Sequence, residues 1–116
     1  MIKTIVCDID GTIFHQAGDC YGQITSHAVL TPGAIEKIRE WERKNYNIVL
    51  LTGRKESTRE TTEKQLAKLG VMYDKLVMGV GGGPRVLIND LKPGKDITMS
   101  VAINVKRNEG LSNVKV

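Results

Sequence analysis

The chain has few of the residues that mark several common protein classes. Its 116 residues include two cysteines, one phenylalanine and one tryptophan. Two cysteines without a histidine at metal-ligand spacing exclude a disulfide-rich scaffold and a zinc site. They favour two free thiols, at Cys7 and Cys20, in a reducing cytoplasm. So few aromatic side chains also give no stacking platform for nucleic-acid bases.

Long hydrophobic runs and blocks of like charge are also absent. No apolar stretch approaches the roughly 20 residues of a membrane helix, and the N-terminal run is too short for a signal peptide. We therefore expect no membrane partner. The net charge of +4 is dispersed along the sequence. It favours an anionic substrate, but without clustered Lys and Arg it does not indicate nucleic-acid binding.

Short apolar runs alternate with helical patterns, and the chain of 116 residues is long enough for one core. We therefore expect a single domain, residues 1–116, without a separate substrate-covering domain. The alternation predicts an α/β fold, with a Rossmann-like parallel sheet flanked by helices on both faces. The expected strands are Thr4–Ile9, Asn47–Thr52, Lys75–Met78, Arg85–Asn89 and Thr98–Val105.

Two helices are expected between these strands. The first opens at Thr31-Pro32-Gly33, with Thr31 as the N-cap and proline at the first helical position, and Trp41 lies on its core-facing stripe. The second covers Glu56–Leu69 and ends at Gly70 as the C-cap. The segment Phe14–Leu30 has no clear period, and we interpret it as a flap.

The first apolar run ends in two carboxylates, Asp8 and Asp10. Unpaired buried carboxylates are costly, so this pair indicates a metal, a cation or a reaction. A surface turn that uses the backbone freedom of Gly11 is the alternative. Thr52-Gly53-Arg54 follows the second run, and Asn89-Asp90 follows the fourth. Because parallel strands bind ligands beyond their carboxyl ends, we expect these groups to converge at one edge.

An oxygen-rich edge of this kind suits Mg²⁺, which commonly shares its coordination shell with a phosphate. The Thr52 hydroxyl and the backbone N–H groups after it, including that of Gly53, can hold phosphoryl oxygens. Arg54 offers a fork of donors to a phosphate. An aspartate can be the nucleophile that forms an aspartyl-phosphate, and a second carboxylate can transfer the protons.

Three segments, in this order, resemble three of the four motifs of the haloacid dehalogenase-like phosphohydrolase superfamily. They are Asp8-Ile9-Asp10-Gly11-Thr12, Ile48–Leu51 running into Thr52, and Val86–Ile88 running into Asn89-Asp90, and the resemblance extends to about Pro93. It implies a Rossmann-like core without a cap domain. It also implies that Asp8 is the nucleophile, Asp10 the general acid/base and a carbonyl ligand of Mg²⁺, Thr52 the phosphoryl binder and Asp90 a further metal ligand.

Two positions depart from the superfamily pattern. Asn89 stands where the fourth motif often has a second aspartate, which would weaken Mg²⁺ affinity. The lysine of the third motif has no clear equivalent. Arg85, after the glycine-rich loop Gly79–Gly83, and Lys75 are the candidates, and we favour Arg85. A solvated surface cation is the alternative for each.

The sequence thus predicts an Mg²⁺-dependent phosphomonoester hydrolase that acts on a small phosphorylated metabolite such as a sugar phosphate. The Thr-Gly-Arg form of the second motif is also similar to that of polynucleotide-end phosphatases, which is the second hypothesis. A phosphate- or metal-binding module with little turnover is the third.

Without a cap domain, specificity must come from the flap, the glycine-rich loop or a neighbouring subunit, so we expect a homo-oligomer. His15, in the flap, is a candidate contact to a leaving group, and a histidine without a role is the alternative. Lys92 and Lys95 are interpreted as a solvated pair.

Overall fold

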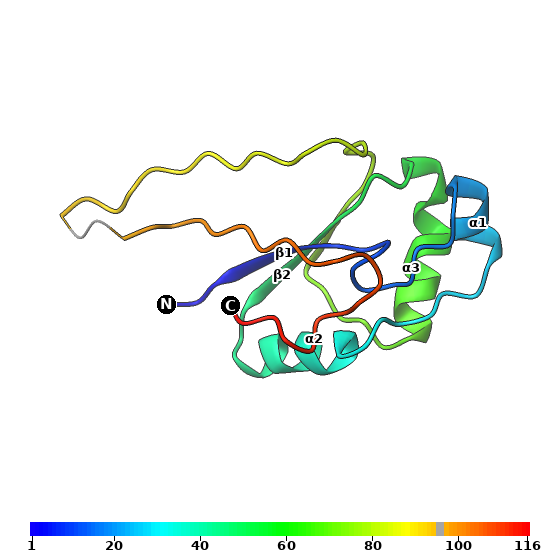
Figure 1. Cartoon of the computed structure of the whole chain (residues 1–116), viewed down its shortest axis with the longest axis horizontal. Helices are drawn as coiled ribbons and strands as arrows, with labels where there is room; N and C mark the ends of the chain where they lie inside the picture. Colours follow the sequence, from blue (N-terminus) through cyan, green and yellow to red (C-terminus); the bar gives the residue numbers. More distant parts are fainter. Residues whose placement is uncertain (95–96) are drawn as a thin grey trace.

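The structure is a computed structural model that describes residues 1–94 and 97–116. Its strands β1 (Thr4–Asp8), β2 (Asn47–Leu51) and β3 (Lys75–Val77) form a parallel sheet in the order β1-β2-β3. The helices are α1 (Cys20–Thr25), α2 (Ala34–Arg43) and α3 (Arg59–Lys68), and the 3₁₀ turn η1 (Glu56–Thr58) precedes α3. Figure 1 shows α1 and α3 side by side at one end of the molecule and α2 along the sheet. The predicted α/β class, with a parallel sheet flanked by helices, is confirmed.

One face of the sheet lies in the core. Ile48 and Leu50 of β2 are 1% and 0% exposed, and Cys7 of β1, which pairs with Leu50, is 7% exposed. Burial raises the pKa of the Cys7 thiol to about 12, so this thiol stays protonated at neutral pH. Trp41 of α2 is also buried, as its helical spacing predicts. Both cysteines are free, which confirms that prediction.

The opposite face of β1 is open to solvent. Side chains alternate along a strand, so Thr4, Val6 and Asp8 share this face, and all three residues are exposed. Val6 is 55% exposed. Among the described residues, β1 pairs only with β2, so its other edge carries no strand. Parallel sheets are normally covered on both faces, and β1 is therefore incompletely covered.

The end of α3 confirms the predicted role of Gly70. This glycine has φ +74°, a left-handed conformation that favours glycine. Its N–H donates to the Ala67 carbonyl at 3.1 Å, and the N–H of Val71 donates to the Leu66 carbonyl at 2.9 Å. This bonding pattern is a Schellman motif. The start of the predicted helix, over Glu56–Thr58, forms the 3₁₀ turn instead.

The predicted start of the first long helix is wrong by two residues. The N-cap of α2 is Gly33, at φ +74°, and the helix begins at Ala34. The Thr31 hydroxyl donates to the carbonyl oxygens of Thr12 and Ile13 instead of capping the helix. A Cβ at Gly33 would overlap Ser112, because the C-terminal tail packs against this turn. A tertiary contact therefore decides where α2 begins.

The predicted strands Arg85–Asn89 and Thr98–Val105 are wrong within the part of the chain that the structure describes. Residues 81–94 form an extended arm, which leaves the sheet and returns through residues 97–105 (Figure 1). Val86, Leu87 and Ile88 are 82%, 66% and 88% exposed. A strand needs a partner for its backbone groups, and the one bridge in the described arm joins Lys92 to Ile97. The molecule measures 50 × 27 × 24 Å along its three principal axes, and the arm contributes to the longest dimension.

The flap contains one short helix, α1, which the sequence pattern did not reveal. Asp19 caps it by accepting a hydrogen bond from the Gly22 N–H at 2.9 Å. Phe14, at the start of the flap, is 1% exposed and belongs to the core instead. No helix in the described ranges is both long and apolar enough to span a bilayer.

Candidate active site

A tight turn after β1 brings Asp10 back beside the end of the strand. Gly11 has φ +89°, and its N–H donates to the Phe14 carbonyl at 2.7 Å. The carbonyl of Ile9 accepts hydrogen bonds from the N–H groups of residues 12, 13 and 14. A Cβ at Gly11 would also lie 3.2 Å from Cγ of Arg107. The backbone angle therefore favours glycine here, and a larger residue would also displace the Arg107 side chain slightly.

Asp8 is the carboxylate that stays available for chemistry. Its Oδ2 accepts one side-chain hydrogen bond, from the Thr12 hydroxyl at 3.3 Å. Partial burial of the carboxyl raises the pKa of Asp8, and the negative charge of Asp10 adds to this. The Ile9 N–H, the Arg85 cation and the Thr12 hydroxyl act in the opposite direction without cancelling the rise. A carboxyl group in this environment favours a neighbouring cation.

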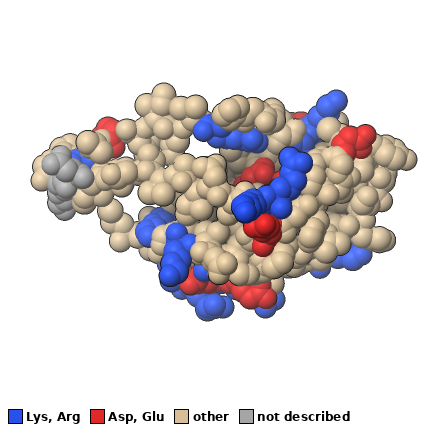
Figure 2. Space-filling model, viewed as in Figure 1, with Lys and Arg blue, Asp and Glu red and all other residues tan. Residues whose placement is uncertain are grey.

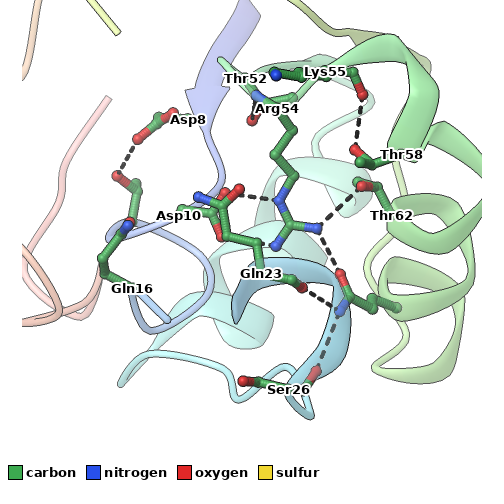
Figure 3. Close-up of polar contacts among 12 residues, drawn as sticks. Asp8, Asp10, Gln16, Gln23, Ser26, Thr52, Arg54, Lys55, Thr58 and Thr62 are labelled. Carbon is green, nitrogen blue, oxygen red and sulfur yellow. Dashed lines mark hydrogen bonds and ion pairs between the residues drawn. The ribbon is translucent and has the colours of Figure 1, made fainter. Parts of the chain in front are cut away.

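Asp10, in contrast, is held by Arg54 (Figure 3). The guanidinium donates from Nε to Oδ2 and from Nη2 to Oδ1 of Asp10, both at 2.7 Å. The Arg54 and Asp10 side chains are 3% and 9% exposed. Nη1 of Arg54 donates to Oγ1 of Thr62 at 3.0 Å and to Oε1 of Gln65 at 2.6 Å. The guanidinium also lies over the Phe14 ring, 5.6 Å from its centroid.

This geometry gives Arg54 a different role from the predicted one. A guanidinium has five N–H groups, and four of those on Arg54 donate to Asp10, Thr62 and Gln65. Arg54 therefore positions Asp10 and has one donor left for a phosphate. Thr62 and Gln65 were missed in the sequence, although their spacing of three residues places them on one face of a helix.

Thr52 and Gly53 shape the second part of the site. Thr52 is 1% exposed, and its Oγ1 accepts a hydrogen bond from the Arg54 N–H at 3.1 Å. A Cβ at Gly53 would lie 2.8 Å from the carbonyl oxygen of Gly81. Gly53 thus lets the glycine-rich loop approach the end of β2. The N–H of Val80 donates to the Thr52 carbonyl at 3.3 Å and secures that approach.

Of the two candidate cations, Arg85 is the one near Asp8. Its charge acts on the Asp8 carboxyl, and its guanidinium donates to the carbonyls of Gly81 and Gly83, both at 3.1 Å. Lys75 is at the start of β3 and pairs with Val49, two residues before the strand end that carries the site. In Figure 2, acidic and basic side chains lie together around a hollow on the face shown.

The predicted metal ligands are not all brought together. No group of three or more His, Cys, Asp or Glu side chains gathers in residues 1–94 and 97–116. Asp90 lies on the exposed arm, after the apolar residues 86–88, and Asn89 is exposed beside it. Both carboxyl oxygens of Asp10 face Arg54, whereas its backbone carbonyl accepts no backbone hydrogen bond in the described ranges. The Asp8 carboxylate and the Asp10 carbonyl thus fit Mg²⁺, and a third protein ligand is missing.

The flap borders the site from the side of Arg54. His15 is exposed and, with His27 and Arg54, lines a cavity of about 70 Å³. Gln65 links the flap to the network, because its Nε2 donates to the Gln23 carbonyl at 2.8 Å (Figure 3). Lys92 is exposed, as interpreted from the sequence, and Lys95 lies outside the described residues.

Comparison with known proteins gives a family match and similarity to several solved structures. The family described as PITM 1-3, LNS2 domain matches residues 5–86. Chains in structures of the Pnkp1/Rnl/Hen1 complex and of the Pnkp1/Rnl/Hen1 RNA repair complex are 32% and 34% identical, each with a TM-score of 0.59 over 66% of this chain. The alignments cover 28% and 25% of those chains, so this chain spans about a quarter of their length.

A third structure, D,D-heptose 1.7-bisphosphate phosphatase from B. bronchiseptica with magnesium and phosphate, aligns at 16% identity and a TM-score of 0.46. That alignment covers 85% of this chain and 56% of the other. No curated protein matches the chain.

Proposed function

Because the chain belongs to the PITM 1-3, LNS2 domain family, a phosphatase-type domain of haloacid dehalogenase-like fold, we propose that it hydrolyses phosphomonoesters through an aspartyl-phosphate. The observation that carries the proposal is the difference between the two carboxylates of the turn. Asp8 faces the open edge near Arg85, and Asp10 is fixed by Arg54. One carboxylate is available to attack, and a second is held in place two residues away.

In the first step, an Oδ of Asp8 attacks phosphorus, and the bond from phosphorus to the ester oxygen breaks. Asp10 gives a proton to the leaving oxygen, and the product alcohol departs. In the second step, Asp10 takes a proton from water, whose oxygen attacks the aspartyl-phosphate and releases inorganic phosphate and Asp8. Both oxygens of Asp10 face Arg54 in this structure. The proton transfer therefore requires that one of them rotates away from Arg54. This oxygen must also carry a proton before the first step, namely the one that Asp10 takes from water in the second step of the preceding turnover.

Other residues of the site bind the phosphate in this proposal. The hydroxyl of Thr52 and the N–H of Gly53, directly after β2, are the proposed donors to phosphoryl oxygens. Arg85 supplies the positive charge that the missing third-motif lysine would give. Mg²⁺, when bound by the Asp8 carboxylate and the Asp10 carbonyl, neutralises phosphoryl charge and orients the substrate. Asp90 completes this ligand set in the proposal.

For the substrate, we propose a small phosphorylated metabolite such as a sugar phosphate, handled in the cytoplasm, where two free thiols are stable. The flap and the glycine-rich loop, which border the carboxyl ends of the strands, set its size. A polynucleotide end is the second candidate, because chains in an RNA repair complex share 34% identity with this one. A site without a cap domain admits a polymer terminus as readily as a metabolite.

The test is phosphate release from a panel of sugar phosphates, nucleotides and 3′-phosphorylated oligonucleotides, with Mg²⁺ and with EDTA. We expect release that requires Mg²⁺ and is lost in Asp8→Asn, which should keep the fold. The preferred compound distinguishes the two substrate classes. Activity retained by Asp8→Asn contradicts the mechanism. No release by folded wild-type protein that binds Mg²⁺ favours the binding module.

A further inference from the structure

The further inference concerns the exposed arm and the uncovered strand of the sheet. In a stable parallel sheet, strands are covered on both faces and at their edges. Here β1 has one free edge within the described residues, and Val6 on its open face is 55% exposed. The same chain carries an apolar segment, Val86–Ile88, whose side chains are 66–88% exposed. The same molecule thus has, in its described ranges, a strand, β1, with one unpaired edge and an apolar segment, residues 86–88, that is exposed to solvent.

Within one copy of the chain, the described arm does not pair with β1 as a parallel strand. Gly79 and Val80 are hydrogen-bonded to Arg54 and Thr52, and Arg85 lies close enough to Asp8 to stabilise its carboxylate. From Arg85 the extended arm runs opposite to β1 in Figure 1. Five extended residues cover about 16 Å, so Asp90 lies far from Asp8 of the same copy. Arg85 and Asp90 therefore cannot both serve one site within a single extended chain.

A second copy of the chain removes this conflict. A two-fold axis perpendicular to the strands makes β1 of the partner antiparallel to β1 of the first copy. The arm, which is antiparallel to its own β1, is then parallel to that of the partner. Such exchange of identical elements is a low-cost route to a symmetric dimer. Both copies gain a fourth parallel strand, and both free edges are filled.

We propose that residues 85–90 of each copy pair with β1 of a second copy, so that each site combines its own Asp8 with the Asp90 of the other copy. The register places Leu87 beside Val6 and Asn89 beside Asp8. Ile88 then lies beside Cys7, on the buried face of the sheet. This inference rests on the proposed function only for the role of Asp90, since the dimer follows from the arm and the edge.

Two experiments test the exchange without relying on activity. Light scattering should give a dimer for the wild type and a folded monomer for Ile88→Lys. The control Val101→Lys changes a residue that is 80% exposed, against 88% for Ile88, and should remain a dimer. In a Cys20→Ser background, Val6→Cys and Leu87→Cys chains refolded together should form a disulfide-linked dimer, because neighbouring strands are about 4.8 Å apart. A wild-type monomer, or no linked dimer, overturns the proposal.

A third experiment tests the shared site. Asp8→Asn and Asp90→Asn chains are each expected to be inactive. After refolding together, half of the dimers are mixed, and each mixed dimer has one intact site, so about one quarter of wild-type activity should return. A dimer whose mixture stays inactive, although the wild type is active, overturns the shared site. An inactive wild type that still gives the linked dimer counts against the proposed function and supports the exchange.

Discussion

Replacing Arg54 with alanine tests whether this buried guanidinium positions Asp10 or serves as a phosphate ligand. The side chains of the pair are 3% and 9% exposed and form two hydrogen bonds of 2.7 Å. Removing one partner of a buried ion pair leaves an uncompensated charge, which costs about 3–5 kcal/mol. The whole domain is expected to be stable by about 5–15 kcal/mol, so this loss is a large share of it.

The measurement is urea unfolding at pH 7, supported by thermal unfolding. A loss of about 4 kcal/mol corresponds to a fall in Tm of roughly 10–25 °C for a domain of this size. Arg59→Ala is the matched control. Arg59 also holds a carboxylate through two hydrogen bonds, to Glu56 at 2.9 and 2.8 Å. It contacts Glu63 and the Leu76 carbonyl as well, but its side chain is 37% exposed. Its removal should cost much less, because water screens an exposed pair.

The Asp10→Asn variant completes a double-mutant cycle. Because the neutral amide is less costly to leave unpaired, the double variant Arg54→Ala/Asp10→Asn should lose less stability than the sum of the single losses. The expected coupling is about 1–3 kcal/mol. Equal losses for Arg54→Ala and Arg59→Ala, or a coupling near zero, would refute the positioning role and return Arg54 to phosphate binding.

Three other predictions concern the nucleophile, the loop and the flap. The raised pKa of Asp8 means that the native state holds this proton more tightly than the unfolded state does. The resulting stabilisation is full below the ordinary value of 3.8 and is lost as the pH rises through the native pKa. The free energy of unfolding of Asp8→Asn, measured in EDTA, should therefore rise relative to that of the wild type as the pH rises from 3 to 7. A difference between the two proteins that does not change with pH contradicts burial of the Asp8 carboxyl as the cause. Gly53→Ala should displace the glycine-rich loop, whose Gly81 oxygen would lie 2.8 Å from the new Cβ, and lower kcat/KM by at least about tenfold with little change in helix content. Gly82→Ala, with open space around it, is the control, and equal activities would refute the contact. Gln65→Met removes the link to Arg54 and the flap and should cost about 1–3 kcal/mol in urea unfolding, because the buried Arg54 guanidinium and the Gln23 carbonyl each lose a partner. A loss no greater than that of an exposed helix residue would refute the link.

Local patterns in the sequence were enough to predict three strands of the sheet and the end of α3. Runs of β-branched residues gave β1 and β2, and Gly70 marked the end of α3 because few other residues adopt its left-handed backbone. The acidic pair at the end of β1 was recognisable because unpaired buried carboxylates are energetically costly and therefore indicate a bound cation or a reaction. These features depend on neighbours in the sequence, and they were predicted correctly.

Features that depend on distant parts of the chain were not predictable. The start of α2 depends on a tail that packs against Gly33, and the partner of Asp10 is a guanidinium 44 positions away. The segment Arg85–Asn89 has the composition of a strand, but a strand also needs a neighbour, and composition does not specify one. The sequence by itself therefore determined three strands and the end of α3, and it indicated the residues from which we propose a phosphatase site. Only the tertiary structure decided which carboxylate is bound by arginine and which strand edge stays open, because both depend on contacts between segments far apart in the chain.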